Sequence, residues 1–155
     1  MRYLKLPPMN AKNSVLLMLC IAFTTSANVD YENFAVKNVY SQPNHKLVEP
    51  SSGNELLDSI RSKESFLPAN FSGHYRIYTF GCGGGALCGE VLDISSGLVV
   101  AMLPDEYLVT NHIDDLKIKF NVNSSLIYIE GDLSNDNEKI KSYYSFFNNK
   151  FHIVK

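Results

Sequence analysis

The spacing of hydrophobic residues changes at Pro68 and divides the chain into a helical part and a β-rich part. Within residues 54–65, Leu56 and Ile60 recur at the four-residue spacing that places side chains on one helical face. Asn54 precedes them as a candidate N-cap, because its side-chain oxygen can accept a backbone N–H of the first turn. The pattern therefore predicts one short amphipathic helix over residues 54–65.

Beyond Pro68 the chain consists of short segments that alternate apolar and polar residues or are rich in aromatic and β-branched residues. Asn148 and Asn149 separate the last two segments, and asparagine tolerates the positive φ angles of a two-residue hairpin turn. The segments expected as strands are residues 74–80, 90–94, 98–103, 117–122, 126–130, 140–147 and 151–154. We therefore expect the α+β class, an antiparallel β-sheet meander of about six to seven strands with the short N-terminal helix packed on it.

The first 27 residues have the three parts of a signal peptide. Three cations precede an apolar run at residues 15–23, and the small residues from Thr24 to Ala27 follow this run. The run is shorter than the roughly 20 apolar residues that span a bilayer, which argues against an uncleaved N-terminal anchor. We therefore expect cleavage after Ala27 and export to the bacterial periplasm.

Cleavage would leave about 128 residues, enough for one hydrophobic core and too few for two ordinary domains. Residues 28–53 are polar and contain Pro43 and Pro50, so we interpret them as an N-terminal arm. Residues 54–155 are interpreted as a single α+β domain.

The net charge of the chain after signal-peptide cleavage indicates which classes of partner it can bind. Loss of residues 1–27 lowers the count of basic residues from 14 to 11 and leaves all 16 acidic residues, a net charge of −5. Nucleic acid and anionic membrane surfaces are poor partners for such a chain. We expect a periplasmic or envelope protein as the partner, no stable membrane insertion after signal removal, and a monomer or weak homodimer.

The cysteine count also depends on cleavage, because Cys20 leaves with the signal peptide while Cys82 and Cys88 remain. A single remaining pair in an exported chain predicts a disulfide. Closing so short a loop stabilises the fold by about 2.4 kcal/mol in the chain-entropy model. We therefore expect its main effect to be local, on the glycine-rich segment that it encloses.

This segment contains Gly81, Gly83, Gly84 and Gly85, which are candidate binding residues. Successive glycines can turn backbone N–H groups to one side and form an anion-binding nest. A phosphate-binding loop would require a Lys and a Ser or Thr before a helix, whereas this segment leads into a predicted strand. A tight turn closed by the disulfide is the favoured interpretation, and no cofactor is predicted.

His74 is the remaining side chain with candidate chemistry. With Cys82 as a free thiol it would suggest a cysteine hydrolase, but a disulfide-bonded Cys82 cannot attack a substrate, and eight residues of strand separate the two. A metal site of His74, Cys82, Cys88 and His112 is disfavoured, because the cysteine spacing exceeds that of zinc knuckles. We expect no catalytic and no metal-ligating residue. His74 is expected to be half-buried beside Gly73, whose missing side chain would let another segment approach closely.

The tyrosines are the last candidate site. They would either form an aromatic binding surface or belong to one sheet face and its rim, the interpretation that we favour. The set comprises Tyr75, Tyr78, Tyr128, Tyr143 and Tyr144. Of these, Tyr75 is kept as a candidate binding residue together with Gly73 and His74.

Two motifs resemble those of a group of small uncharacterised bacterial periplasmic proteins, whose pattern is Asn-Phe-Ala-Gly-His-Tyr followed by Trp-Gly-Cys-Gly-x-Gly-Cys. The matching segments are Asn-Phe-Ser-Gly-His-Tyr at residues 70–75 and Phe-Gly-Cys-Gly-Gly-Gly at residues 80–85. Phe80 stands where the group has Trp, and the second cysteine lies at Cys88 where the pattern places it at Ala86. The resemblance implies a periplasmic domain of this type over roughly residues 54–155, and it implies no activity.

These observations favour a non-enzymatic periplasmic protein that acts by binding an envelope protein partner. One alternative is an immunity protein or inhibitor of a periplasmic toxin or cell-wall hydrolase. Another is an envelope accessory factor that supports secretion or intracellular growth. A third is a small-anion or muropeptide-binding module that uses the glycines and His74.

Overall fold

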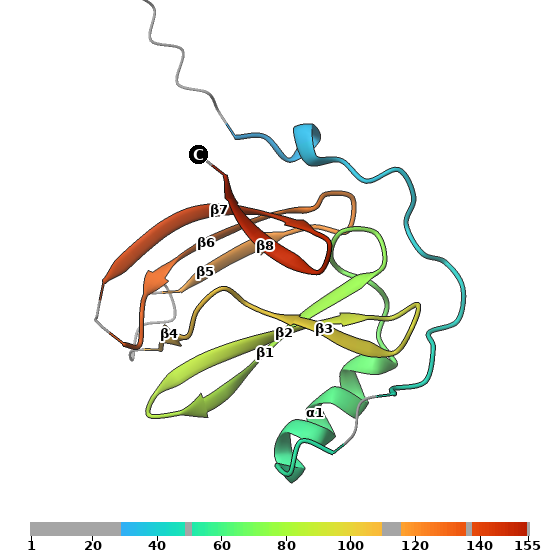
Figure 1. The fold of residues 1–155 in the computed structure, drawn as a ribbon, viewed down its shortest axis with the longest axis horizontal. Coiled ribbons are helices and arrows are strands. Elements are labelled where there is room, and N and C mark those ends of the chain that lie inside the picture. Colours follow the sequence, from blue (N-terminus) through green and yellow to red (C-terminus); the bar gives the residue numbers. More distant parts are fainter. Residues whose placement is uncertain (1–28, 49–50, 110–115, 136–137, 155) are drawn as a thin grey trace, which may run out of the picture.

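The computed structural model describes residues 29–48, 51–109, 116–135 and 138–154. Within these ranges the chain has eight strands in two four-stranded antiparallel sheets, one α-helix and one short 3-10 helix, η1 (Figure 1). The elements are η1 Tyr31–Phe34, α1 Glu55–Ser65, β1 Tyr75–Gly83, β2 Ala86–Asp93, β3 Leu98–Met102, β4 Tyr107–Leu108, β5 Lys117–Phe120, β6 Leu126–Asp132, β7 Lys139–Phe147 and β8 Lys150–Val154. The α+β class is confirmed.

The strands differ from the expected meander in number and in arrangement. They divide between a first sheet of β1, β2, β3 and β4 and a second sheet of β5, β6, β7 and β8, where the sequence pattern predicted one sheet of six to seven strands. The added strand is β4, which has two residues. A strand of this length is too short to show the alternation on which the prediction depends.

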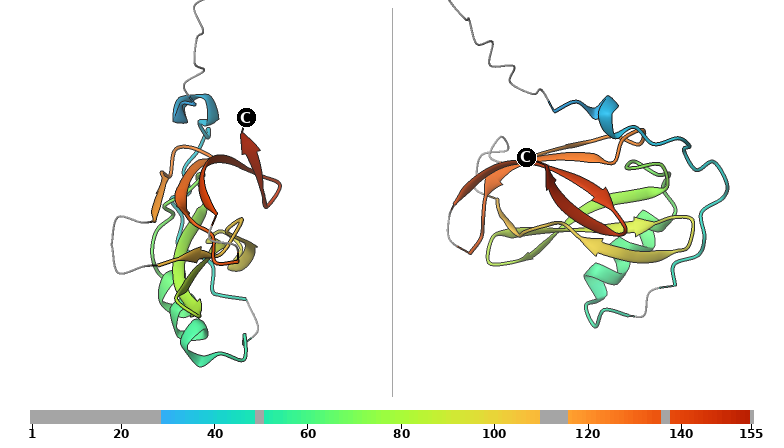
Figure 2. Two further views of the ribbon diagram at one scale, coloured as in Figure 1. Left: turned by 90° about the vertical axis from the view of Figure 1, so that its left-hand side faces the viewer. Right: turned by 45° about the horizontal axis from the view of Figure 1, so that its top comes forward.

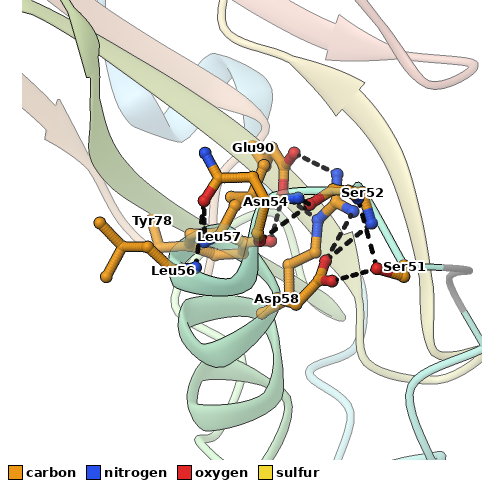
Figure 3. Close-up of polar contacts among 10 residues, drawn as sticks. Ser51, Ser52, Asn54, Leu56, Leu57, Asp58, Tyr78 and Glu90 are labelled. Carbon is orange, nitrogen blue, oxygen red and sulfur yellow. Dashed lines mark hydrogen bonds and ion pairs between the residues drawn. The ribbon is translucent and has the colours of Figure 1, made fainter.

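Helix α1 begins as predicted. The Asn54 side chain accepts hydrogen bonds from the backbone N–H groups of Leu56 and Leu57 at 3.0 and 3.2 Å (Figure 3). Asp58 accepts two further hydrogen bonds, from the Ser51 hydroxyl and the Ser52 N–H. Asn54 therefore satisfies two N–H groups of the first turn, and Asp58 ties the segment before the helix to that turn.

The first sheet lies between the second sheet and α1, and Figure 1 shows these three layers from top to bottom. Alternation along β1 divides its side chains between the two interfaces. Ile77 belongs to the core shared with Ile127 and Phe146 of the second sheet. Its neighbour Tyr78 points to the other face and joins a smaller cluster that includes Ile60 of α1. One strand thus contributes to both cores.

The N-terminal arm runs past loops at the ends of strands of both sheets before it reaches α1 (Figures 1 and 2). Backbone N–H groups of Val36 and Tyr40 donate to Asn123 and Gly73, each at 2.9 Å. A Cβ atom on Gly73 would lie 2.7 Å from the backbone oxygen of Asn38. The expected close approach at Gly73 is therefore confirmed, and the approaching segment is the arm.

The predicted signal peptide, including Cys20, lies outside the described residues. Among the helices of the described part, none is long and apolar enough to cross a membrane.

Candidate functional site

The predicted disulfide is present and joins Cys82 of β1 to Cys88 of β2. Phe80 pairs with Cys88 and Gly81 with Leu87, and the register then shifts so that Gly83 pairs with Ala86. Cys82 is therefore the extra residue of a β-bulge, which redirects its side chain toward the neighbouring strand. Cys82 is exposed, whereas Cys88 is 6 % exposed. The bond fits an oxidising compartment.

The glycine-rich segment forms the tip of this hairpin. Gly84 and Gly85 have φ angles of +59° and +80°, the positive values that a two-residue type I′ turn requires. All four candidate glycines from Gly81 to Gly85 are exposed. Their conformation is accounted for by the bulge and the turn, which agrees with the favoured interpretation of the sequence.

Strand β4 places an acidic residue beside the disulfide. Ala86 pairs with Leu108 and Leu87 with Tyr107, so antiparallel pairing brings Glu106 opposite Cys88. A Glu106 carboxylate oxygen and the sulfurs of Cys82 and Cys88 all lie within 4.8 Å of one another. The backbone oxygen of Glu106 also accepts from the Ser134 N–H at 2.9 Å, which ties β4 to the end of the second sheet.

A cavity of about 490 Å³ opens next to this cluster. Its lining consists of Cys88, Gly89, Met102, Leu103, Pro104, Asp105, Glu106, Ser134 and Asn135, and we call it the hairpin groove. Two acidic residues, Asp105 and Glu106, belong to this lining, as does Met102, which is 49 % exposed. The groove therefore offers negative charge beside an accessible, flexible apolar side chain.

His74 lies far along the strand from the disulfide. It directly precedes β1, whereas Cys82 is at the opposite end of that strand. Its ring packs on Tyr75 at a centroid distance of 4.0 Å, and it is half-buried as expected. The structure thus does not bring His74 to the cysteines, and His112 lies outside the described residues.

The tyrosines do not form one surface. The Tyr78 side chain is buried against α1, whereas Tyr128 and Tyr143 pack on each other in the second sheet with ring centroids 4.9 Å apart. The Tyr75 hydroxyl donates to Asn149 at 3.1 Å. These side chains belong to different faces of two sheets. The alternative of a common aromatic surface is therefore wrong, and so is the favoured interpretation of one sheet face and its rim.

A buried polar cluster beneath α1 was not predicted. The Glu90 side chain is 2 % exposed and accepts two hydrogen bonds from Arg61, at 2.7 and 3.0 Å, and a third from the Tyr78 hydroxyl (Figure 3). Burial, and then the hydrogen bond to Glu90, raise the pKa of Tyr78 above its usual range. The sequence signal was a carboxylate, Glu90, in the interior of strand β2 between Gly89 and the apolar Val91.

A second ion pair also joins α1 to the first sheet. Arg76 of β1 contacts the Glu64 carboxylate at 2.6 Å and donates to the Pro68 oxygen at 2.8 Å. Together with the Glu90 cluster it fixes the helix on the sheet from which the disulfide hairpin extends. These pairs hold the helix on the sheet, and we assign them no chemical step.

No family model, curated protein or solved structure matches this chain. The resemblance to the periplasmic group accordingly remains a prediction from sequence motifs.

Proposed function

We propose that this protein is exported to the periplasm and acts there, without catalysing a reaction, by binding a segment of an envelope protein in the hairpin groove. The observation that carries the proposal is the groove itself, a cavity of about 490 Å³ beside an exposed hairpin. A cavity of this size falls in the range that accommodates a few side chains of a partner.

The groove is built on elements that hold their shape. The disulfide joins β1 to β2, and β2 pairs with both β3 and β4. A preorganised surface loses little conformational entropy when it binds, so more of the contact free energy appears as affinity. This rigidity supports binding by a fixed surface rather than by a loop that folds around its ligand.

The charge of the groove indicates the chemistry of the partner. Asp105 and Glu106 line it, and the mature chain has a net charge of −5. A segment with Lys or Arg beside an apolar residue complements these carboxylates and the Met102 side chain. An anionic ligand would be repelled here, so the groove favours a basic peptide over a small anion.

The state of the cysteines supports binding over hydrolysis. In the disulfide neither Cys82 nor Cys88 has a thiolate, the species that attacks a substrate. A cysteine hydrolase would require Cys82 as a free thiol, and Cys82 is not free while the disulfide is formed.

Site-specific photo-crosslinking tests the proposal. A benzophenone amino acid at Met102, in the groove, is compared with the same residue at Ile153, which is 62 % exposed on β8. Crosslinking in intact cells of the source bacterium should give a defined adduct from position 102 that is missing from position 153. Equal adducts from both positions, or none from position 102, would contradict the proposal.

The captured protein is then purified and its affinity measured by calorimetry. The double variant Asp105→Asn/Glu106→Gln should bind it about tenfold more weakly, because two carboxylates at the groove are lost. Affinity for the wild-type protein should also fall as salt is raised. Unchanged affinity of the double variant would remove the groove as the binding site.

A further inference from the structure

We propose that reduction of the disulfide converts the end of the hairpin groove into a Zn²⁺ site formed by Cys82, Cys88 and Glu106. The two sulfurs and a Glu106 carboxylate oxygen already lie within 4.8 Å of one another. They come from three neighbouring strand segments, and Cys88 on β2 lies between the other two. This inference does not depend on the partner-binding proposal.

The spacing of the three ligand atoms suits a tetrahedral ion. With Zn–S bonds of about 2.3 Å and Zn–O bonds of about 2.0–2.2 Å, ligand atoms around zinc lie about 3.5–3.8 Å apart. The cluster therefore needs side-chain adjustments on the order of 1 Å once the sulfurs separate. Cys82 can make this adjustment because it is the residue of the bulge. Water would occupy the fourth position on the open side of the groove.

The ligand chemistry selects zinc over the common hard cations. Thiolates are soft ligands that favour Zn²⁺, whereas Mg²⁺ and Ca²⁺ prefer sets of oxygen atoms. Two thiolates and one carboxylate carry three negative charges, which the ion largely offsets. The bound site would keep an overall charge of −1, and Asp105 in the same groove adds to the negative surroundings.

Reduction requires a dithiol, either a small molecule or a protein with a reactive cysteine pair. One thiolate of the dithiol attacks the exposed Cys82 sulfur, and the Cys82–Cys88 bond breaks to release the Cys88 thiolate. This step leaves a mixed disulfide between Cys82 and the dithiol. The second thiol of the dithiol then attacks the dithiol sulfur that is bonded to Cys82 and releases the Cys82 thiolate. Two electrons pass to the protein, the dithiol becomes a disulfide, and its two protons pass to the cysteines or, when Zn²⁺ binds, to solvent.

Zinc binding and reduction are therefore linked. Only the reduced protein offers two thiolates, so Zn²⁺ draws the equilibrium toward the dithiol form. Without metal, Glu106 next to the Cys88 thiolate adds repulsion and favours the disulfide. At a fixed ratio of reduced to oxidised dithiol, the reduced fraction of the protein should rise as Zn²⁺ is added.

Cobalt provides a spectroscopic probe of this site. The exported protein is reduced anaerobically, freed of reductant and titrated with Co²⁺, which gives thiolate-to-cobalt charge-transfer absorption when cysteines bind it. We expect one Co²⁺ per chain and complete displacement by Zn²⁺. The variant Cys82→Ser/Cys88→Ser should show no such absorption. Absence of charge-transfer absorption in the reduced wild-type protein would overturn the proposal.

Two neighbouring carboxylates give a matched pair of variants. Glu106→Gln removes a proposed ligand and should weaken Zn²⁺ binding at least about tenfold in competition with a chromophoric chelator. Asp105→Asn removes the same charge from the same groove but no ligand, and should change the affinity by less than about threefold. Equal affinities for the two variants would overturn the assignment. Far-UV circular dichroism follows folding, and a reduced wild-type protein that is unfolded and does not refold with Zn²⁺ also counts against it.

Discussion

Replacing Arg61 by methionine tests the buried polar cluster beneath α1. The substitution keeps an unbranched side chain of similar length and removes the guanidinium that holds Glu90 at 2.7 and 3.0 Å. The Glu90 carboxylate, 2 % exposed, then retains only the Tyr78 hydroxyl among these partners. A buried charge that loses its counter-charge is costly, so the variant should be markedly less stable.

The expected loss follows from the burial of both partners. Side chains of Arg61 and Glu90 are 13 % and 2 % exposed, so solvent screens the pair little. Removal of one member of such a pair costs about 3–5 kcal/mol. Because the Tyr78 hydroxyl still donates to Glu90, we take the lower value of about 3 kcal/mol. At a urea dependence of about 1.5 kcal/mol per M, the unfolding midpoint should fall by about 2 M.

Urea unfolding of the oxidised protein, followed by circular dichroism, measures this shift. The control is Lys117→Met, which breaks the Lys117–Glu130 pair at 3.7 Å, where the lysine side chain is 46 % exposed. An exposed pair contributes at most about 1 kcal/mol. The double variant Arg61→Met/Glu90→Gln removes the uncompensated charge and should regain at least about 1 kcal/mol of the loss.

Two results would refute this reasoning. Equal losses for Arg61→Met and Lys117→Met would show that the Glu90 carboxylate is not sequestered from solvent. A double variant that is no more stable than Arg61→Met would show that the loss comes from packing of the arginine side chain rather than from a buried charge.

Three further substitutions test other parts of the fold. Gly73→Ala should loosen the N-terminal arm, because the new Cβ would lie 2.7 Å from the Asn38 backbone oxygen and residue 73 has a φ of +83°. Hydrogen exchange in the arm should become faster, and unchanged exchange would contradict this expectation. Cys82→Ser/Cys88→Ser should cost about 2.4 kcal/mol in urea unfolding, and a negligible cost would mean that the hairpin is held without the bond. Asn54→Ala should cost about 1 kcal/mol through the lost cap, whereas a change within the error of the same assay would show that the Ser51–Asp58 contacts suffice.

The elements of the fold were largely predictable, because their signals are local. The cap at Asn54 depends on N–H groups two and three residues along the chain. The turn at Asn148 and Asn149 depends on the φ angles of those two residues, which are +51° and +58°. The disulfide followed from a count of cysteines in a chain that we expect to be exported. The cap and the turn each depend on residues close together in the sequence, and the disulfide depends only on the number of cysteines.

The division into two sheets and the strand β4 were not predictable. Tyr107 of β4 is 0 % exposed and bridges to Leu133, so its place depends on contacts with both sheets. A two-residue strand has no periodicity of its own. Its existence is decided by the partners that it meets in three dimensions, and the groove and the position of Glu106 depend on it.

The sequence by itself determined the α+β class, the helix with its cap, most strands, the Asn-Asn turn and the cysteine pair. Only the tertiary structure decided that Glu106 lies beside the disulfide, that Glu90 is buried against Arg61, and that His74 is remote from Cys82. The reason is physical. Capping, turns and alternation act between near neighbours, whereas these contacts join residues up to 29 positions apart and require the register of several strands at once.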